Sequence, residues 1–112
     1  MRKSNRVKKD RDFQVVFKQG KSYANRKFVV YAKDRELGRL RVGLSVSKKL
    51  GKAVTRNQIK RRLRHVLMGL EANLLPYDLV IIARKGVEDL SYADIHQHLT
   101  HVLKLANLYQ ED

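Results

Sequence analysis

The apolar run LVIIA, residues 79–83, is the segment that most restricts how this chain can fold. Its five residues show no alternation with polar ones, so neither side of a strand built from them suits water. A strand of this kind is buried on both faces. We therefore expect residues 79–83 to form the central strand of a sheet.

Two further strands are expected upstream, over residues 27–33 and 40–47, where β-branched and aromatic residues are enriched. The second segment alternates, with Val42, Leu44 and Val46 on one face. Residues 34–39 have the composition of a turn, so we expect the two segments to pair as antiparallel strands. A third short strand before the next helix is left open.

Shorter helices are expected near both ends of the chain. Phe13, Val16 and Phe17 have the spacing i, i+3 and i+4, and Gly20 can supply the left-handed residue that ends this first helix. The last helix has Ser91 as its N-cap. Its buried stripe is expected to contain Tyr92, Ile95, Leu99, Val102, Leu103 and Ala106.

A long helix is expected from about residue 56 to residue 75, where the proline that follows ends it. Thr55 and Gln58 match a capping box, and Val54 and Ile59 have the spacing of a hydrophobic staple. The face of this helix toward the core is expected to contain Ile59, Leu63, Val66, Leu67, Leu70 and Leu74.

The opposite face of the long helix carries the wrong charge for a helix start. It contains Asn57, Lys60, Arg61 and Arg64, and Arg56 adds a further cation in the first turn. Each cation in the first turn opposes the helix dipole by about 0.3–1 kcal/mol, and an ordinary solvated face would mix charges or place acids first. A bound phosphate would neutralise these cations together. We therefore interpret this face as an anion-binding surface.

The net charge also points to a polyanionic partner. The chain carries a formal charge of +14, and residues 1–64 hold 22 Lys and Arg against four Asp and Glu. Such a field attracts nucleic acid first and anionic membrane second. The 112 residues suffice for one RNA-binding domain, 1–112, in which the basic residues 1–9 are expected to form a flexible tail.

Missing residue types narrow the function further. The chain has no cysteine, which excludes disulfides, cysteine nucleophiles and cysteine-bound zinc. No apolar run approaches the roughly 20 residues of a membrane span, and no signal-peptide core follows the basic start. We therefore expect a cytoplasmic protein.

The segment TRNQIKRRLR, residues 55–64, resembles the Arg-Asn signature of the protein subunit of bacterial ribonuclease P. The segments RVKKDRDFQVVFKQGKSYANRKFVVY, LRVGLSVSKKLGKAV and DLVIIARKG resemble other parts of that family in the same order. The resemblance implies an α+β fold, a two-layer α/β sandwich with a central mixed sheet and helices packed on it. It also implies a left-handed β-α-β crossover through the long helix, as in the second domain of ribosomal protein S5.

The resemblance further implies a partner and a site. A catalytic RNA with bound Mg²⁺ would cleave the 5′ leader from precursor tRNA, while the protein supplies affinity and no catalytic residue. The leader would lie in a cleft between the first helix and the sheet, with Lys60 and Arg61 at its edge. The implied RNA-binding residues are Phe13, Phe17, Tyr31, Lys48, Arg56, Asn57, Lys60, Arg61 and Arg64.

Several alternatives stay open at this point. Phe13 and Phe17 have the spacing of core residues, although Val16 could serve the core instead. A metal site can be drawn from Asp94, His98 and His101, but no fourth ligand is visible, so no metal is expected on the protein alone. A ribosomal-type structural RNA-binding protein is the main functional alternative, and a nuclease that works unaided is another.

The chain departs from the family pattern in two places. Arg62 stands where the family often has an aliphatic residue, which either extends the basic surface or exposes a long side chain at the edge of the core stripe. The chain ends in the residues QED, without the basic extension that some members carry. RNA contacts at the C-terminus are therefore not expected.

Overall fold

The central strand predicted from the apolar run is present. The structure is a computed structural model that describes Arg6 and residues 10–34 and 39–110. The run lies in strand β4 (Tyr77–Ala83), which has a hydrogen-bonded strand on either side. The sheet has the order β1-β2-β4-β3, where β1 is Lys21–Ala24, β2 is Phe28–Asp34 and β3 is Arg41–Val46.

Strands β2 and β3 do not pair with each other, so the expected antiparallel pair is wrong. Strand β4 lies between them, antiparallel to β2 and parallel to β3. This arrangement gives the apolar strand a neighbour on each edge, whereas a β2–β3 pair would leave it at the rim of the sheet. The strand that the sequence left open is β1, which pairs with β2.

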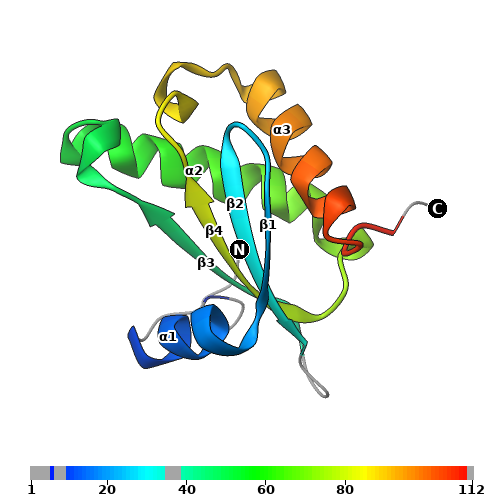
Figure 1. Cartoon of the computed structure of the whole chain (residues 1–112). Helices are drawn as coiled ribbons and strands as arrows, with labels where there is room; N and C mark the ends of the chain where they lie inside the picture. Colours follow the sequence, from blue (N-terminus) through cyan, green and yellow to red (C-terminus); the bar gives the residue numbers. More distant parts are fainter. Residues whose placement is uncertain (1–5, 7–9, 35–38, 111–112) are drawn as a thin grey trace.

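Helix α2 (Ala53–Leu70) connects β3 to its parallel neighbour β4. In Figure 1 this helix runs behind the sheet while the chain passes from β3 to β4 on its right. The crossover is therefore left-handed, as the resemblance implies. Because nearly all such connections are right-handed, the pattern of apolar residues would not have predicted this one.

The helices are divided between the two faces of the sheet (Figure 1). Helices α2 and α3 (Tyr92–Leu105) cover one face, and the short helix α1 (Asp10–Gln19) covers part of the other. The predicted core face of the long helix is confirmed for the five residues that lie on α2, and the sixth, Leu74, is also buried but follows the helix, after a 3-10 turn. They pack in one cluster with residues of the sheet and of α3, including Phe28, Val30, Leu79, Ile81, Ile95, Leu99 and Leu103.

Helix α2 begins earlier and ends earlier than expected. Its N-cap is Lys52, with no side-chain hydrogen bond, so the capping box of Thr55 and Gln58 is wrong. Val54 is 70% exposed and forms no staple. The cause lies in the preceding chain, where the 3-10 turn η2 (Lys48–Leu50) and Gly51, with φ of 137°, turn the backbone into the helix three residues sooner. After Leu70 a 3-10 turn, η3 (Glu71–Asn73), replaces the expected last turn.

The expected start of α3 is confirmed, because the Ser91 hydroxyl accepts a hydrogen bond of 3.1 Å from the Asp94 N–H. The expected stripe is buried except for Tyr92, which is 44% exposed. Tyr92 is the first residue of the helix, and its ring contacts His65 of α2 on the outside of the molecule. Its place in the core was therefore wrongly predicted.

The expected flexible tail, residues 1–9, lies outside the described residues except for Arg6. Arg6 forms an isolated parallel bridge with Val42, beside the outer edge of β3. The final residues 111–112 are also outside the described part of the chain. Among the helices that the structure describes, none combines the length and the apolarity needed to cross a bilayer.

Candidate RNA-binding site

Three aromatic rings form a row between α1 and the sheet. The ring centroids of Phe13 and Phe17 are 6.4 Å apart, and Phe17 meets Tyr31 of β2 edge-to-face at 5.0 Å. All three side chains are half-buried, whereas Val16 is only 1% exposed. The structure thus brings the three predicted aromatic residues together and gives the core position on α1 to Val16.

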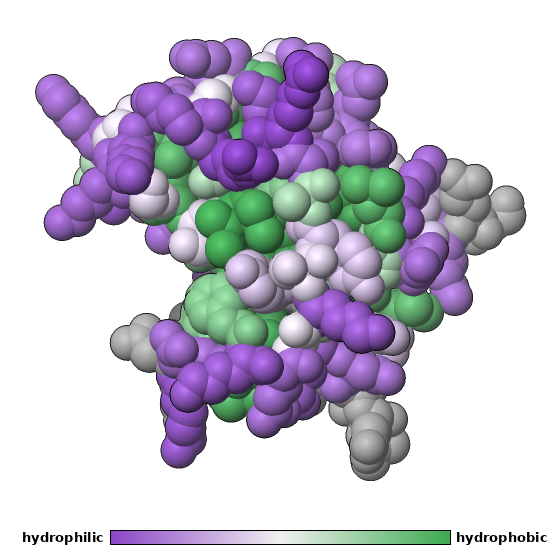
Figure 2. Space-filling model, in the orientation of Figure 1, coloured by the Kyte–Doolittle hydropathy of each residue, from purple (hydrophilic) through white to green (hydrophobic). Residues whose placement is uncertain are grey.

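The floor beside this aromatic row is the uncovered face of the β2–β4 pair. On the face that carries Tyr31, the next cross-strand pair is Val29 and Ile82, and both residues are half-buried. The next cross-strand pair consists of two basic residues, Lys27 and Arg84. The Arg84 N–H donates a 2.9 Å hydrogen bond to the Lys27 carbonyl. Figure 2 shows hydrophobic surface in the middle of this side of the molecule, between hydrophilic borders. We call this strip, from the aromatic row to Lys27 and Arg84, the cleft.

Gly20 holds α1 close to the sheet. Its φ is not positive, so the expected left-handed end of the helix is wrong. A Cβ at this position would lie 2.6 Å from the Val16 carbonyl oxygen and 2.8 Å from that of Ala32, closer than side chains tolerate. Glycine is required because two backbones meet here, and the contact sets the distance between α1 and β2.

We predict that Gly20→Ala destabilises the protein by about 1–3 kcal/mol, because neither backbone carbonyl can move aside freely. The matched control is Gly69→Ala on α2, where an added Cβ meets nothing within 4 Å. That variant should be neutral or more stable by about 0.5–1 kcal/mol. Urea unfolding of both variants checks the prediction, and equal stabilities would show that Gly20 is not a close-packing position.

An ion pair fixes the end of the cleft that lies beneath α1. The Nε and Nη2 of Arg41 donate to the two carboxylate oxygens of Asp78 at 2.9 and 2.8 Å, and Asp12 of α1 lies 4.0 Å from Nη1. Hydrogen bonding to Asp78 raises the pKa of Arg41. The guanidinium therefore stays charged and joins β3, β4 and α1.

Apart from Arg62, the cations of α2 lie in two adjacent rows along its outer side. One row contains Arg56, Lys60, Arg64 and Met68, and the other contains Asn57, Arg61 and His65. Among the described residues, no carboxylate forms an ion pair with any Lys or Arg of these rows. Neither end of the helix has the complementary charge, as the first turn has no acid and the last turn no base.

Part of this surface is hollowed. A hollow of about 480 Å³ is lined by Arg6, Asn57, Arg61, Arg64, His65 and Met68. Burial, and the nearby guanidinium of Arg6, lower the pKa of Arg64. Like charges are therefore held together in this hollow, which suits an anion. We call this set of residues the arginine hollow.

The remaining predicted site residues lie near these two surfaces. Lys48 is exposed in η2, directly after β3, whose last residue pairs with the end of β4, so it lies at the same end of the sheet as Arg84. Arg56 is half-buried, and its Nε has no hydrogen-bond partner among the described residues. No described contact joins Lys60 or Arg61 to the aromatic row, and their place at the edge of the cleft stays a prediction. Arg62 is exposed.

Some members of these surfaces were missed by the sequence analysis. Arg6 belongs to a basic segment without periodicity, and Lys27 and Arg84 are 57 positions apart in the sequence. His65 and Met68 could have been predicted from the sequence, because they continue the two rows of cations at spacings of four.

The described residues contain no group of three or more His, Cys, Asp or Glu that could hold a metal ion. Of the residues considered for a metal site, His101 instead has its Nδ1 3.2 Å from the Asn25 side-chain nitrogen. The same nitrogen donates to the His98 carbonyl at 2.8 Å. These contacts join the β1–β2 turn to α3 and have a structural role.

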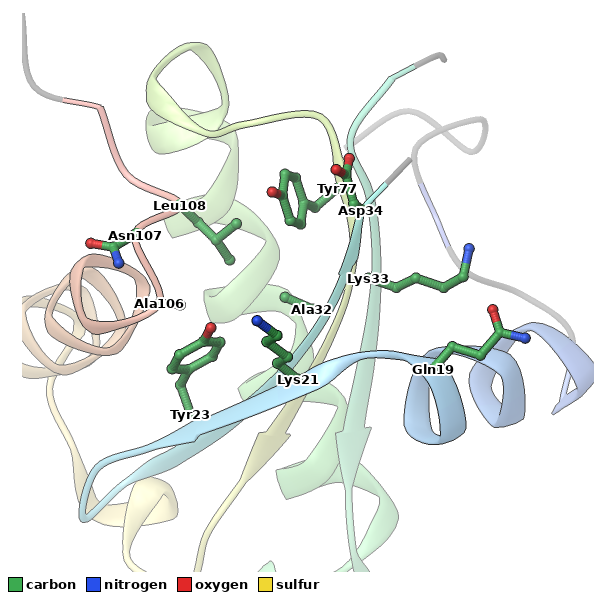
Figure 3. A pocket seen from close by; sticks show the side chains of 10 residues that line it. All are labelled: Gln19, Lys21, Tyr23, Ala32, Lys33, Asp34, Tyr77, Ala106, Asn107 and Leu108. Carbon is green, nitrogen blue, oxygen red and sulfur yellow. The ribbon is translucent and has the colours of Figure 1, made fainter. Parts of the chain in front are cut away.

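A second hollow, of about 430 Å³, lies where the C-terminal end of α3 meets strands β1 and β2 (Figure 3). Tyr23 and Tyr77 border it, and the cation of Lys21 shares it with the carboxylate of Asp34. Its charges are therefore mixed, unlike those of the arginine hollow. Asn107, which follows α3 with a positive φ of 57°, is among its lining residues.

Comparison with known proteins identifies the family. The family model described as ribonuclease P matches residues 1–107. The ribonuclease P protein component of Streptococcus thermophilus is 63% identical over 111 residues, which cover 99% of this chain and 100% of the relative. The Streptococcus pneumoniae protein of the same name is 57% identical, over 99% of this chain and 91% of the relative. The chain belongs to the ribonuclease P protein family.

Solved structures of the ribonuclease P protein agree with this assignment. The Staphylococcus aureus structure has a TM-score of 0.90 and 44% identity, and the match covers 96% of this chain and all of that one. The Thermotoga maritima structure has a TM-score of 0.82 and 31% identity, over 89% and 96% of the two chains. The α+β fold expected from the resemblance is confirmed.

Membership of the ribonuclease P protein family settles the general function. The chain is the protein component of ribonuclease P, a ribonucleoprotein endoribonuclease of tRNA 5′ processing, and it works with an RNA subunit. The assignment decides against the ribosomal-type alternative and against a nuclease that works unaided. It does not assign a role to either of the two surfaces described above.

Proposed function

We propose that the cleft binds the single-stranded 5′ leader of precursor tRNA, and that the cationic rows of α2 bind the catalytic RNA subunit. The observation that carries the proposal is the row of three half-buried rings beside an uncovered sheet face. Unpaired bases stack on such rings with about 1–3 kcal/mol per base and with little sequence preference. A subunit that serves many different precursors needs this tolerance.

The register of the sheet gives the cleft two chemically different ends, one aromatic and one basic. From Tyr31 the cleft face continues through Val29 to Lys27, which is four residues and about 13 Å along β2. Bases would therefore stack near α1, while the phosphates that follow reach Lys27, Arg84 and Lys48 at the other end. In duplex RNA the faces of the bases are already stacked on one another, so these rings favour a single strand.

The protein's contribution is proposed to be binding, with the chemistry left to the RNA. Of the carboxylates near α1, Asp78 is buried and hydrogen-bonded to Arg41, and Asp12 lies 4.0 Å from the same guanidinium, which disfavours a role as general base for either. Mg²⁺ is proposed to be bound mainly by the RNA subunit, whose phosphates are the kind of oxygen ligand that it prefers. The cytoplasm, where precursor tRNA is made in bacteria, is the proposed compartment.

The test compares precursor and mature tRNA. Kd values are measured for both with the catalytic RNA alone and with the assembled holoenzyme, at fixed salt and Mg²⁺. We expect the protein to tighten binding of the precursor at least tenfold and to leave mature tRNA within about twofold. Equal tightening of both would place the protein's contacts on the tRNA body and contradict a leader site in the cleft.

A further inference from the structure

An aromatic pair borders the arginine hollow, and the proposed function gives its two rings no role of their own. The rings of His65 on α2 and Tyr92 on α3 have centroids 5.3 Å apart and are inclined by 54°. His65 is exposed, Tyr92 is 44% exposed, and the neighbouring Met68 is 55% exposed. Two rings in contact and an exposed thioether on the next turn of α2 thus lie beside a strongly basic surface.

The side chains along this part of α2 match the two parts of one nucleotide, its phosphate and its base. Arg61 and Arg64 come first, and His65 and Met68 follow within the next turn, all around the same hollow. The cations suit a phosphate, whose oxygens accept hydrogen bonds from guanidinium groups. The rings and the thioether suit the face of a base. A hollow of about 480 Å³ is also large enough for a group of that size.

We propose that the His65–Tyr92 pair, with Met68, is a stacking site for one unpaired nucleotide of the catalytic RNA subunit, whose phosphate is held by Arg61 and Arg64. The proposal rests on the assignment of α2 to the RNA subunit. Charge complementarity selects RNA as the occupant, because the hollow has guanidinium groups on one side and no carboxylate among its lining residues. An unpaired base is required, since a paired one would not expose its face.

The alternative is a purely structural role, in which the two rings serve only to pack α2 against α3. Tyr92 is the first residue of its helix and is 44% exposed, whereas buried residues of both helices, such as Leu67 and Leu99, already belong to one core cluster. Removing the Tyr92 ring should therefore change stability little. The two readings predict different outcomes for the same variant.

The experiment measures binding of the purified protein to the catalytic RNA transcript over a range of salt concentrations. We expect Tyr92→Leu to weaken binding about tenfold with an unchanged log–log salt slope, because stacking releases no counterions. Tyr92→Phe keeps the ring and should stay within about twofold. Arg61→Gln should instead reduce the slope by about 0.7–0.9, the loss of one phosphate contact.

A second pair of variants guards against local misfolding. His65→Leu should weaken binding severalfold, whereas His96→Leu, the same change at an exposed α3 position outside the arginine hollow, should have no effect. If Tyr92→Leu and His65→Leu both bind as the unchanged protein does, the stacking site is refuted. If Arg61→Gln also binds normally and with the same slope, the assignment of α2 to the RNA subunit fails as well.

Discussion

The double substitution Phe13→Leu and Phe17→Leu should lower the affinity of the holoenzyme for precursor tRNA by about 100-fold. Each ring that loses a stacked base removes about 1–3 kcal/mol, and two modest losses together give about 3 kcal/mol. Leucine keeps much of the apolar volume of phenylalanine. Both rings are half-buried, so the fold should tolerate the change.

Two controls make the double substitution decisive. Tyr23→Leu removes a half-buried ring on the opposite face of the sheet and should leave precursor binding unchanged. Mature tRNA, which has no leader, should bind the double variant and the unchanged holoenzyme equally. A large fall in Tm with precursor affinity intact would show that the rings serve the core and not the leader.

The parts of the fold that were predicted correctly depend on residues close together in the sequence. The run 79–83 has no polar residue within it, so its burial could be inferred without knowing its neighbours. The core face of α2 follows from spacings of three and four, and the cap at Ser91 from one side chain and the next turn. Local patterns of this kind survive any arrangement of the rest of the chain.

The parts that failed depend on contacts between distant residues. The sequence predicted that β2 pairs with β3, which follows it in the chain. In the structure β4, which begins more than 40 residues after the start of β2, lies between them. The start of α2 was set by the backbone at Gly51 and not by the polar side chains of Thr55 and Gln58. The apolar Tyr92 was taken as core because its outward direction at the first helical position cannot be read from spacing.

The residues of the candidate site also divide into those that the sequence indicated and those that it did not. The rings of Phe13, Phe17 and Tyr31 were connected by the family resemblance, and the structure places them together. The basic row of α2 was visible because its charge opposes the helix dipole. The other end of the cleft was not visible, since Lys27 and Arg84 become neighbours only through the register of β2 and β4.

The largest expected loss of stability comes from Asp78→Ala. Asp78 is 5% exposed and receives two hydrogen bonds from Arg41. Removing one partner of a buried ion pair costs about 3–5 kcal/mol, and the lower end applies because the Arg41 side chain is 29% exposed. A loss of about 3 kcal/mol should lower the Tm by about 10 °C or more in a chain of this size.

Replacing both partners separates the pair's net contribution from the effect of an orphaned charge. Arg41→Met with Asp78→Leu removes both charges and fills the space with apolar groups, so most of the lost stability should return. Because Arg41 also faces Asp12, the double variant should still bind precursor tRNA less well than the unchanged protein, through a looser α1. A double variant as unstable as Asp78→Ala would show that the hydrogen-bond geometry, and not the unpaired charge, holds β3 against β4.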